Sequence, residues 1–243
     1  MRISTTLFAA LSVVLTLSST TAVAENQDAV WCNGGADLAT ENWLKACTAV
    51  IESGAAKDER AVAHYNRARA YRGAGQNELA IADYTAAITL LPDFAIAFQN
   101  RGAVQNALGH VDRAIADYSR AIKLQPDLAV AYNNRGVAYK ATGQYARAIA
   151  DLTKAIELDP NGPWAYNNRG DAYFKAGEWS KAIADYSLAL ALNPDLSYAL
   201  FARGVAKTFR GDRVSGQADM AAAVEKNPNV AAEQARDGIA PGT

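Results

Sequence analysis

Residues 129–162 read AVAYNNRGVAYKATGQYARAIADLTKAIELDPNG, and residues 163–196 read PWAYNNRGDAYFKAGEWSKAIADYSLALALNPDL. The two segments align without a gap, and the same pattern recurs every 34 residues over about 170 of the 243 residues. A regular period of this length is typical of stacked helical-hairpin repeats. The sequence therefore predicts five units, which are residues 61–94, 95–128, 129–162, 163–196 and 197–230.

Recurring small residues, glycines and prolines predict that each unit is a helix, a turn, a second helix and a second turn. Small residues recur at positions 8, 20 and 27 of the unit, where they allow two antiparallel helices to approach closely. Glycine recurs at position 15, from Gly75 to Gly211, and it tolerates the positive φ of a tight turn after a helix. Proline recurs at position 32, from Pro92 to Pro228, where it cannot continue the second helix.

The five units resemble the tetratricopeptide repeat family. The resemblance implies an all-α fold, a right-handed α-solenoid of five helical hairpins with a capping segment at each end. One hairpin cannot bury its apolar face alone, so stacking creates the core and the ends need covers. We expect residues 25–60 to form the N-terminal cap and residues 231–243 the C-terminal cap and tail. A short helix is expected over Val230–Arg236, with fraying from Gly238 onward.

The first residues have the features of a secretory signal peptide. Arg2 supplies a positive charge, Leu7 to Leu17 form a short apolar core, and Ala22-Val23-Ala24 is a small-x-small cleavage site. We expect cleavage after Ala24, no integral membrane segment in the mature chain, and a periplasmic or secreted protein. The alternative is an uncleaved membrane anchor.

The chain has two cysteines, Cys32 and Cys47, and both fall in the expected N-terminal cap. An even number of cysteines in an exported protein indicates a disulfide, which would hold that cap closed. The alternative is a pair of free buried thiols.

Two charged rows depart from the family pattern, which usually has leucine at position 7. Position 7 is arginine and position 23 is aspartate in all five units: Arg67, Arg101, Arg135, Arg169 and Arg203, with Asp83, Asp117, Asp151, Asp185 and Asp219. The two positions have similar heights on antiparallel helices, so we predict structural ion pairs within a hairpin or between neighbours. The alternative is an arginine row that binds anions.

Asparagines recur on the first helix of the unit, which lines the concave face in this family. They are Asn66, Asn100, Asn134 and Asn168 at position 6, with Asn133 and Asn167 at position 5. A primary amide both donates and accepts hydrogen bonds, so each can hold a peptide unit. The row is similar to the asparagine ladders of some tetratricopeptide superhelices, and we predict a peptide-binding role. The alternative is that these amides satisfy only local hydrogen bonds.

Aromatic residues gather at positions expected to be concave in the last two units: Trp164, Phe174, Tyr198, Phe201 and Phe209. Exposed aromatics on one face often mark a binding hot spot, so we predict a greasy pocket near the C-terminus. The alternative is that some pack between helices or under the C-terminal cap.

Composition narrows the class of function. Lysine and arginine total 24 against 25 acidic residues, which gives no basic excess for nucleic acid. No catalytic or phosphate-binding motif appears, so we expect no enzyme and no cofactor or metal. The leading hypothesis is an exported scaffold that binds an extended peptide or flexible protein segment. The alternatives are a structural envelope-assembly component that oligomerises or docks through its convex face, and a binder of small molecules or glycans.

Overall fold

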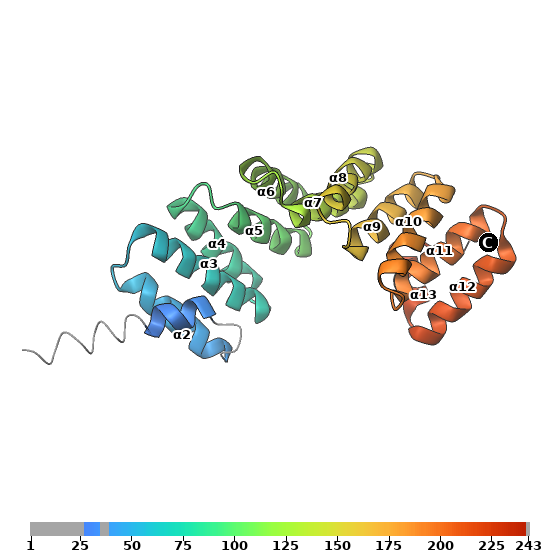
Figure 1. Cartoon of the computed structure of the whole chain (residues 1–243). Coiled ribbons are helices and arrows are strands. Elements are labelled where there is room, and N and C mark those ends of the chain that lie inside the picture. Colours follow the sequence, from blue (N-terminus) through green and yellow to red (C-terminus); the bar gives the residue numbers. More distant parts are fainter. Residues whose placement is uncertain (1–26, 35–38, 242–243) are drawn as a thin grey trace, which may run out of the picture. The chain divides into compact units, whose positions relative to one another are not determined.

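The computed structural model describes residues 27–34 and 39–241, and within these ranges every regular element is a helix (Figure 1). The predicted signal peptide lies outside the described residues. The helices divide into two compact units, a first that ends at Pro92 and a second that begins at Asp93. The chain is thus an all-α fold of solenoid type, as predicted.

The first unit holds the first repeat and the N-terminal cap. Residues 27–34 are helical, and the helices that follow are α2 (Thr40–Glu52), α3 (Lys57–Gly73) and α4 (Asn77–Leu90). Helices α3 and α4 form the hairpin of repeat one, and α2 packs on α3.

The second unit stacks four hairpins in chain order. Its helices are α5 (Ala95–Ala107), α6 (Val111–Leu124), α7 (Ala129–Ala141), α8 (Tyr145–Leu158), α9 (Pro163–Lys175), α10 (Trp179–Leu192), α11 (Ser197–Phe209), α12 (Arg213–Lys226) and α13 (Val230–Arg236). We call the first helix of each hairpin helix A and the second helix B. Each helix A of this unit packs on its own helix B, and α7, α9 and α11 also pack on the helix B before them and on the helix A before them. Because neighbouring A helices contact one another, they lie on the inner side of this stack.

The turn between helices A and B is closed by glycine. In the third repeat, Gly143 has a φ of 75°, its N–H donates to the carbonyl of Lys140 at 3.1 Å, and the N–H of Gln144 donates to the carbonyl of Tyr139 at 2.9 Å. These two bonds satisfy helix-end carbonyls that would otherwise lack a donor, and the turn needs a residue without a Cβ.

Each end of the chain is covered by a small core of its own. A disulfide joins Cys32 to Cys47, with a Cα–Cα distance of 4.7 Å, and the indole N–H of Trp43 donates to the carbonyl of Cys32 at 2.9 Å. At the other end, Val230 and Ile239 are buried in the core formed by the last two repeats. The expected fraying from Gly238 is therefore wrong for Ile239, because its apolar side chain completes that core.

Position 8 brings the two helices of a hairpin into close contact. A Cβ added to Gly204 would lie 2.6 Å from the carbonyl oxygen of Gly216, and one added to Gly136 would lie 2.7 Å from the side chain of Leu152. No Cβ fits at such distances unless the helices move apart. The small residues thus set the distance between helices A and B, as the repeat pattern predicts.

Gly204→Ala is expected to destabilise the protein by about 2 kcal/mol, because the new Cβ meets backbone that cannot rotate away. Gly73→Ala is the matched control, since a Cβ at that helical glycine meets nothing within 4 Å. That variant should be neutral or gain up to about 1 kcal/mol. Urea unfolding followed by circular dichroism measures both changes, and equal stabilities of the two variants would contradict the close-packing account.

Candidate functional site

Every repeat carries an ion pair between its own two helices. The guanidinium of the position 7 arginine donates to the position 23 aspartate through two parallel bonds, Nε to Oδ2 at 2.7–2.8 Å and Nη2 to Oδ1 at 2.7–2.9 Å. The pairs are Arg67–Asp83, Arg101–Asp117, Arg135–Asp151, Arg169–Asp185 and Arg203–Asp219. The arginine row is thereby neutralised within each hairpin.

The third arginine nitrogen connects consecutive hairpins. Nη1 donates to a serine or threonine hydroxyl of the preceding helix B, at position 25 of the preceding unit. The bonds are Arg135 to Ser119 at 3.0 Å, Arg169 to Thr153 at 3.0 Å and Arg203 to Ser187 at 3.3 Å. In the first repeat, Nη1 of Arg67 donates to the hydroxyl of Thr48 on α2, at 2.9 Å. Sequence reasoning missed these hydroxyls, although serine or threonine at position 25 of units one to four was a visible signal.

The ion pairs also set the charge state of two carboxyl groups. Burial alone would raise the pKa of Asp83, but hydrogen bonds from Arg67 and His64 outweigh it and lower the pKa. The same balance holds at Asp219, where burial is opposed by hydrogen bonds from Arg203 and Lys207 and the pKa is again lowered. Both groups therefore favour their ionised form in the folded state.

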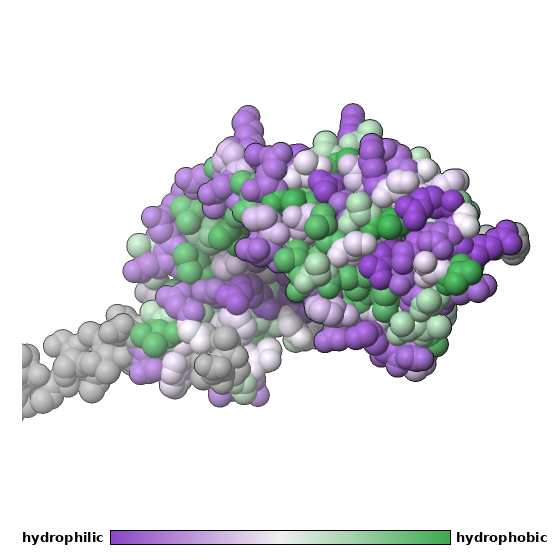
Figure 2. All heavy atoms as spheres, turned by 45° about the vertical axis from the view of Figure 1, so that its right-hand side comes forward, coloured by the Kyte–Doolittle hydropathy of each residue, from purple (hydrophilic) through white to green (hydrophobic). Residues whose placement is uncertain are grey.

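The A helices of the second unit expose apolar side chains at a repeated position. Ile96, Val130 and Trp164 occupy position 2 of successive A helices and are 39%, 55% and 53% exposed. The residue after each of them is a buried alanine, so the helices are oriented with position 2 toward solvent. In Figure 2, apolar patches lie among polar side chains on the surface that comes forward. We call Ile96, Val130 and Trp164 the position 2 row.

The asparagines at positions 5 and 6 of the same helices form amide-to-amide hydrogen bonds. Asn168 Nδ2 donates to Asn133 Oδ1 at 3.0 Å, and Asn133 Nδ2 donates to Asn134 Oδ1 at 3.3 Å. These bonds join α7 to α9 and align two repeats. Asn167 is buried, and its Oδ1 has no partner among the described residues. Asn100 is half-buried on α5, where its Oδ1 is 3.5 Å from Gln99 Nε2.

Asn66 belongs to the first unit and is occupied within it. It is buried, its Nδ2 donates to Asn33 Oδ1 at 3.1 Å, and its Oδ1 is 3.5 Å from Arg69 Nη1. Asn66 thus ties repeat one to the N-terminal cap.

The five aromatic residues do not form a single pocket. Phe201 is 3% exposed and lies in the core with Val230 of α13. Phe174 is 9% exposed and packs edge-on against Phe209 at 5.5 Å between ring centroids. Tyr198 is only partly buried and hydrogen-bonds Glu233, which raises the pKa of its hydroxyl. Trp164 stands in the position 2 row.

A second aromatic contact was not predicted. Trp179, at the start of α10, packs against Phe209 in a tilted arrangement, with 5.6 Å between ring centroids, and is itself 37% exposed. Trp179 follows the inter-helix glycine, a position that the family does not assign to the concave face. Phe209 and Trp179 thus present an exposed aromatic pair at the turn edge of the last two repeats.

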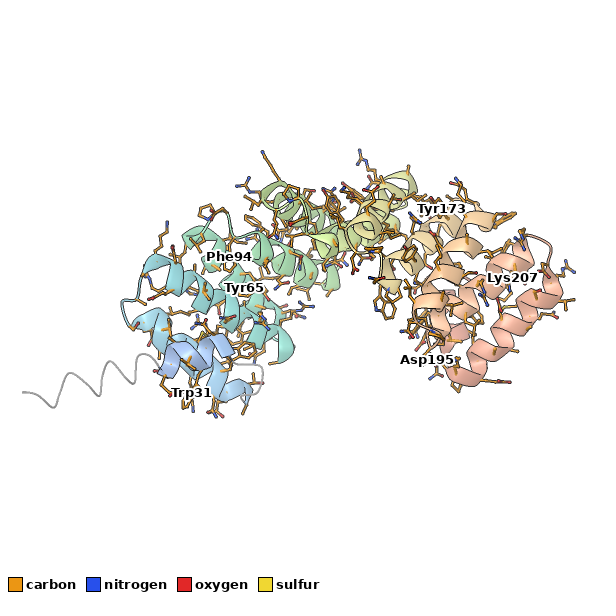
Figure 3. All side chains as sticks on the ribbon, viewed as in Figure 1. Trp31, Tyr65, Phe94, Tyr173, Asp195 and Lys207 are labelled. Carbon is orange, nitrogen blue, oxygen red and sulfur yellow. A yellow bond between two sulfur atoms is a disulfide. The ribbon has the colours of Figure 1, made fainter. Side chains whose placement is uncertain are left out.

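The lysines of the inner A helices are bound within the chain. Lys140 Nζ contacts Asp171 Oδ2 at 2.6 Å, and Tyr186 donates to the other oxygen of Asp171 at 3.0 Å. Lys175 donates to the carbonyl of Asp237, and Lys207, labelled in Figure 3, pairs with Asp219 at 2.8 Å. These three lysines therefore have partners within the protein, and the surface around them offers a ligand mainly apolar and amide groups.

Two further properties concern the described residues as a whole. They contain no group of three or more histidine, cysteine, aspartate and glutamate residues arranged to hold a metal ion. Within the same residues, no helix combines the length and apolar character that crossing a membrane requires.

Asp151→Ala should cost about 2–3 kcal/mol, because Arg135 is left mostly buried without its counter-charge. The double change Arg135→Leu with Asp151→Ala should recover much of this loss, since leucine buries without needing a partner. Glu157→Ala removes an exposed ion pair with Lys154 and should change stability by less than about 0.5 kcal/mol. Denaturant unfolding measures all three, and a double variant no more stable than Asp151→Ala alone would refute the interpretation.

Acid should weaken the fold through Asp83 and Asp219. Because their pKa values are lower in the folded state, their stabilisation is complete above the unfolded pKa of about 3.9 and is lost as pH falls through the folded values. Melting temperatures between pH 6 and pH 2.5 should therefore fall less steeply for Asp83→Asn with Asp219→Asn than for the wild type. Parallel curves for the two proteins would show that these carboxylates do not carry the effect.

The sequence matches family models of helical repeats. Models described as tetratricopeptide repeat match residues 61–94 and 163–196, and a model described as TPR repeat matches residues 106–143 and 138–177. No curated protein shows significant sequence similarity to the chain.

Solved structures share the fold. MamA from Desulfovibrio magneticus RS-1 is similar with a TM-score of 0.66 and 20% identity, over 72% of this chain and 98% of that one. YrrB, described as a TPR protein with an unusual peptide-binding site, aligns with a TM-score of 0.64 and 21% identity over 76% and 94% of the two chains. PilF of Pseudomonas aeruginosa aligns with a TM-score of 0.69 and 18% identity over 88% and 96%.

Proposed function

The chain belongs to the tetratricopeptide repeat family, and we propose that it is an exported, non-enzymatic scaffold for protein–protein interactions. Its ligand is an extended peptide or a flexible segment of a protein, held on the inner face of the second unit. The observation that carries this proposal is the position 2 row, which places one exposed apolar side chain on the helix A of three successive hairpins that also carry the asparagines.

The spacing of the row fits an extended chain. Packed helices lie about 8–10 Å apart, and an extended peptide advances about 3.3 Å per residue. One side chain of the position 2 row would therefore meet every third residue or so of a bound peptide. A regular ligand of this kind needs a regular surface, which the stacked A helices provide.

The asparagines supply polar contacts beside that row. Internal bonds use the Nδ2 of Asn168 and the Oδ1 of Asn134, while the Oδ1 of Asn168 and the Nδ2 of Asn134 have no partner among the described residues. Together these two atoms offer an acceptor and a donor to a peptide group. Such contacts recognise backbone, so side-chain preference would come from Ile96, Val130 and Trp164.

Two further observations support the export part of the proposal. The Cys32–Cys47 disulfide is typical of proteins in oxidising compartments. The sequence before it has the charge, apolar core and cleavage site of a signal peptide. YrrB, which has a similar fold, is described as having a peptide-binding site. This similarity adds support for a peptide ligand here.

A competing role in envelope assembly is favoured by one observation. Leu188 and Leu192 lie one turn apart on α10, a B helix, and are 48% and 42% exposed. An apolar helix face of this kind suits docking through the convex side or self-association. Multi-angle light scattering of the mature chain, with Leu188→Lys as the disrupting variant, separates this role from peptide binding.

The proposed function predicts a specific loss of peptide affinity. After an array of 12-residue peptides has identified binders, Trp164→Ala should weaken them by about tenfold or more, as truncation of a central tryptophan does. Asn134→Ala with Asn168→Ala should cost about fivefold, because each lost hydrogen bond contributes roughly 0.5–1.5 kcal/mol. Fluorescence anisotropy measures both dissociation constants.

Leu188→Ala is the matched control, because it removes an exposed apolar side chain from a B helix. Its affinity should equal that of the wild type. If Trp164→Ala and the double asparagine variant keep wild-type affinity while melting normally, the inner face is not the binding surface.

A further inference from the structure

A hollow lies within the first unit. It is a pocket of about 670 Å³ between the helical segment 27–34, the end of α2 and the start of α3. Ligand pockets commonly fall in the range of about 300–1,000 Å³, so the size suits a real occupant. Neither peptide binding on the inner face of the second unit nor the repeat pattern explains this pocket, because segment 27–34 and α2 lie outside the five repeats.

The residues that line this pocket are of two chemical kinds. Small apolar side chains that are buried or half-buried, among them Ala29, Val50 and Val62, form what we call the floor, together with Cys32 of the disulfide. The carboxylates line the same hollow from two separate elements, Asp28 from segment 27–34 and Asp58 with Glu59 from α3. We call these three residues the acidic rim.

The described residues that line the pocket include no positive charge to pair with the acidic rim. Among these described residues there is no lysine, arginine or histidine, and neither Lys57 nor Arg60, which flank the α3 carboxylates in the sequence, is one of them. The pocket therefore combines an apolar floor with an uncompensated negative edge.

The simplest account of the α3 carboxylates is local. Asp58 and Glu59 lie in the first turn of α3, where negative charge is favoured, and Glu59 Oε2 accepts from the N–H of Ala56 at 3.3 Å. Asp28 likewise lies at the start of the helical segment 27–34, so the same preference for negative charge covers it. That preference does not explain why carboxylates from two elements border one apolar hollow, whereas complementarity to a ligand does.

We propose that this pocket binds a basic peptide segment of a partner protein, in which an aliphatic side chain is flanked by lysine or arginine. The aliphatic side chain enters the floor beside Val50 and Val62, and the flanking cations pair with the acidic rim. The disulfide is part of this site, because it fixes segment 27–34, which carries Asp28, against α2. The site is independent of the inner face of the second unit.

The test uses the full mature chain and a fluorescein-labelled hexapeptide, Lys-Val-Leu-Lys-Arg-Lys, in an anisotropy titration. The matched peptide Glu-Val-Leu-Glu-Glu-Glu has the same apolar pair and opposite charge. We expect the basic peptide to bind with an affinity that falls as salt rises, since exposed charges are screened. The acidic peptide should not bind.

The variant Asp28→Asn with Asp58→Asn and Glu59→Gln removes the charge while keeping the size of each side chain, and glutamine preserves the helix cap. Affinity for the basic peptide should fall about tenfold, because each exposed charge pair contributes a factor of a few. Glu78→Gln with Asp112→Asn and Glu157→Gln removes three exposed charges elsewhere and should change nothing. A rim variant that binds as the wild type does, or an acidic peptide that binds equally well, would overturn the proposal.

Two further measurements distinguish this site from the peptide surface proposed on the inner face of the second unit. Reduction of the disulfide, or Cys32→Ala with Cys47→Ala, should abolish binding of the basic peptide while ligands of the second unit still bind. Trp164→Ala should have the reverse effect. If Trp164→Ala weakens the basic peptide and Val62→Trp, which fills the hollow, does not, the basic peptide binds on that inner face and the pocket is not its site.

Discussion

The structure depends on one repeated interaction, the guanidinium that joins three helices. The position 7 arginine binds the aspartate of its own helix B with two nitrogens and a hydroxyl of the preceding helix B with the third. Leucine, which the family usually has at this position, would pack in many orientations at similar cost. A planar guanidinium with three fixed partners allows only one, so the interaction specifies the register between hairpins more than it adds stability.

That register determines what the inner face can recognise. Because successive A helices are held at one height, position 2 and the asparagines align in rows from Ile96 to Trp164 instead of scattering. The charged groups near the rows are already paired, as Lys140 is with Asp171. What remains accessible is apolar surface and amide, the chemistry that suits an uncharged extended chain.

The sequence was informative where each residue acts within its own unit, and less so where it acts between units. The period, the turn glycines and the arginine–aspartate pair could all be predicted, because every copy repeats the same local requirement. The hydroxyls of Ser119 and Thr153 escaped notice because the arginine that each one binds lies on the following hairpin and not on its own. Phe201 has a position that the family exposes, but α13 covers it, and no repeat pattern encodes a cover that occurs once. The N-terminal pocket was unpredictable for the same reason, since two of the three helices that form it, segment 27–34 and α2, lie outside the repeats.

The arginine–hydroxyl bond also explains the contacts at the first and the last repeat. In the third, fourth and fifth repeats the arginine binds a hydroxyl on the helix B of the preceding repeat, and the first repeat has no preceding repeat to supply one. The disulfide-closed cap supplies it, because Thr48 of α2 accepts from Arg67 as Ser119 does from Arg135. Asn33 likewise accepts from Asn66, as Asn133 does from Asn168. After the fifth repeat no further position 7 arginine occurs, and position 25 of that repeat is Ala221, the one copy without a hydroxyl. The N-terminal cap thus substitutes for a missing repeat in its contacts, and its remaining surface is free to form a pocket that the repeats do not have.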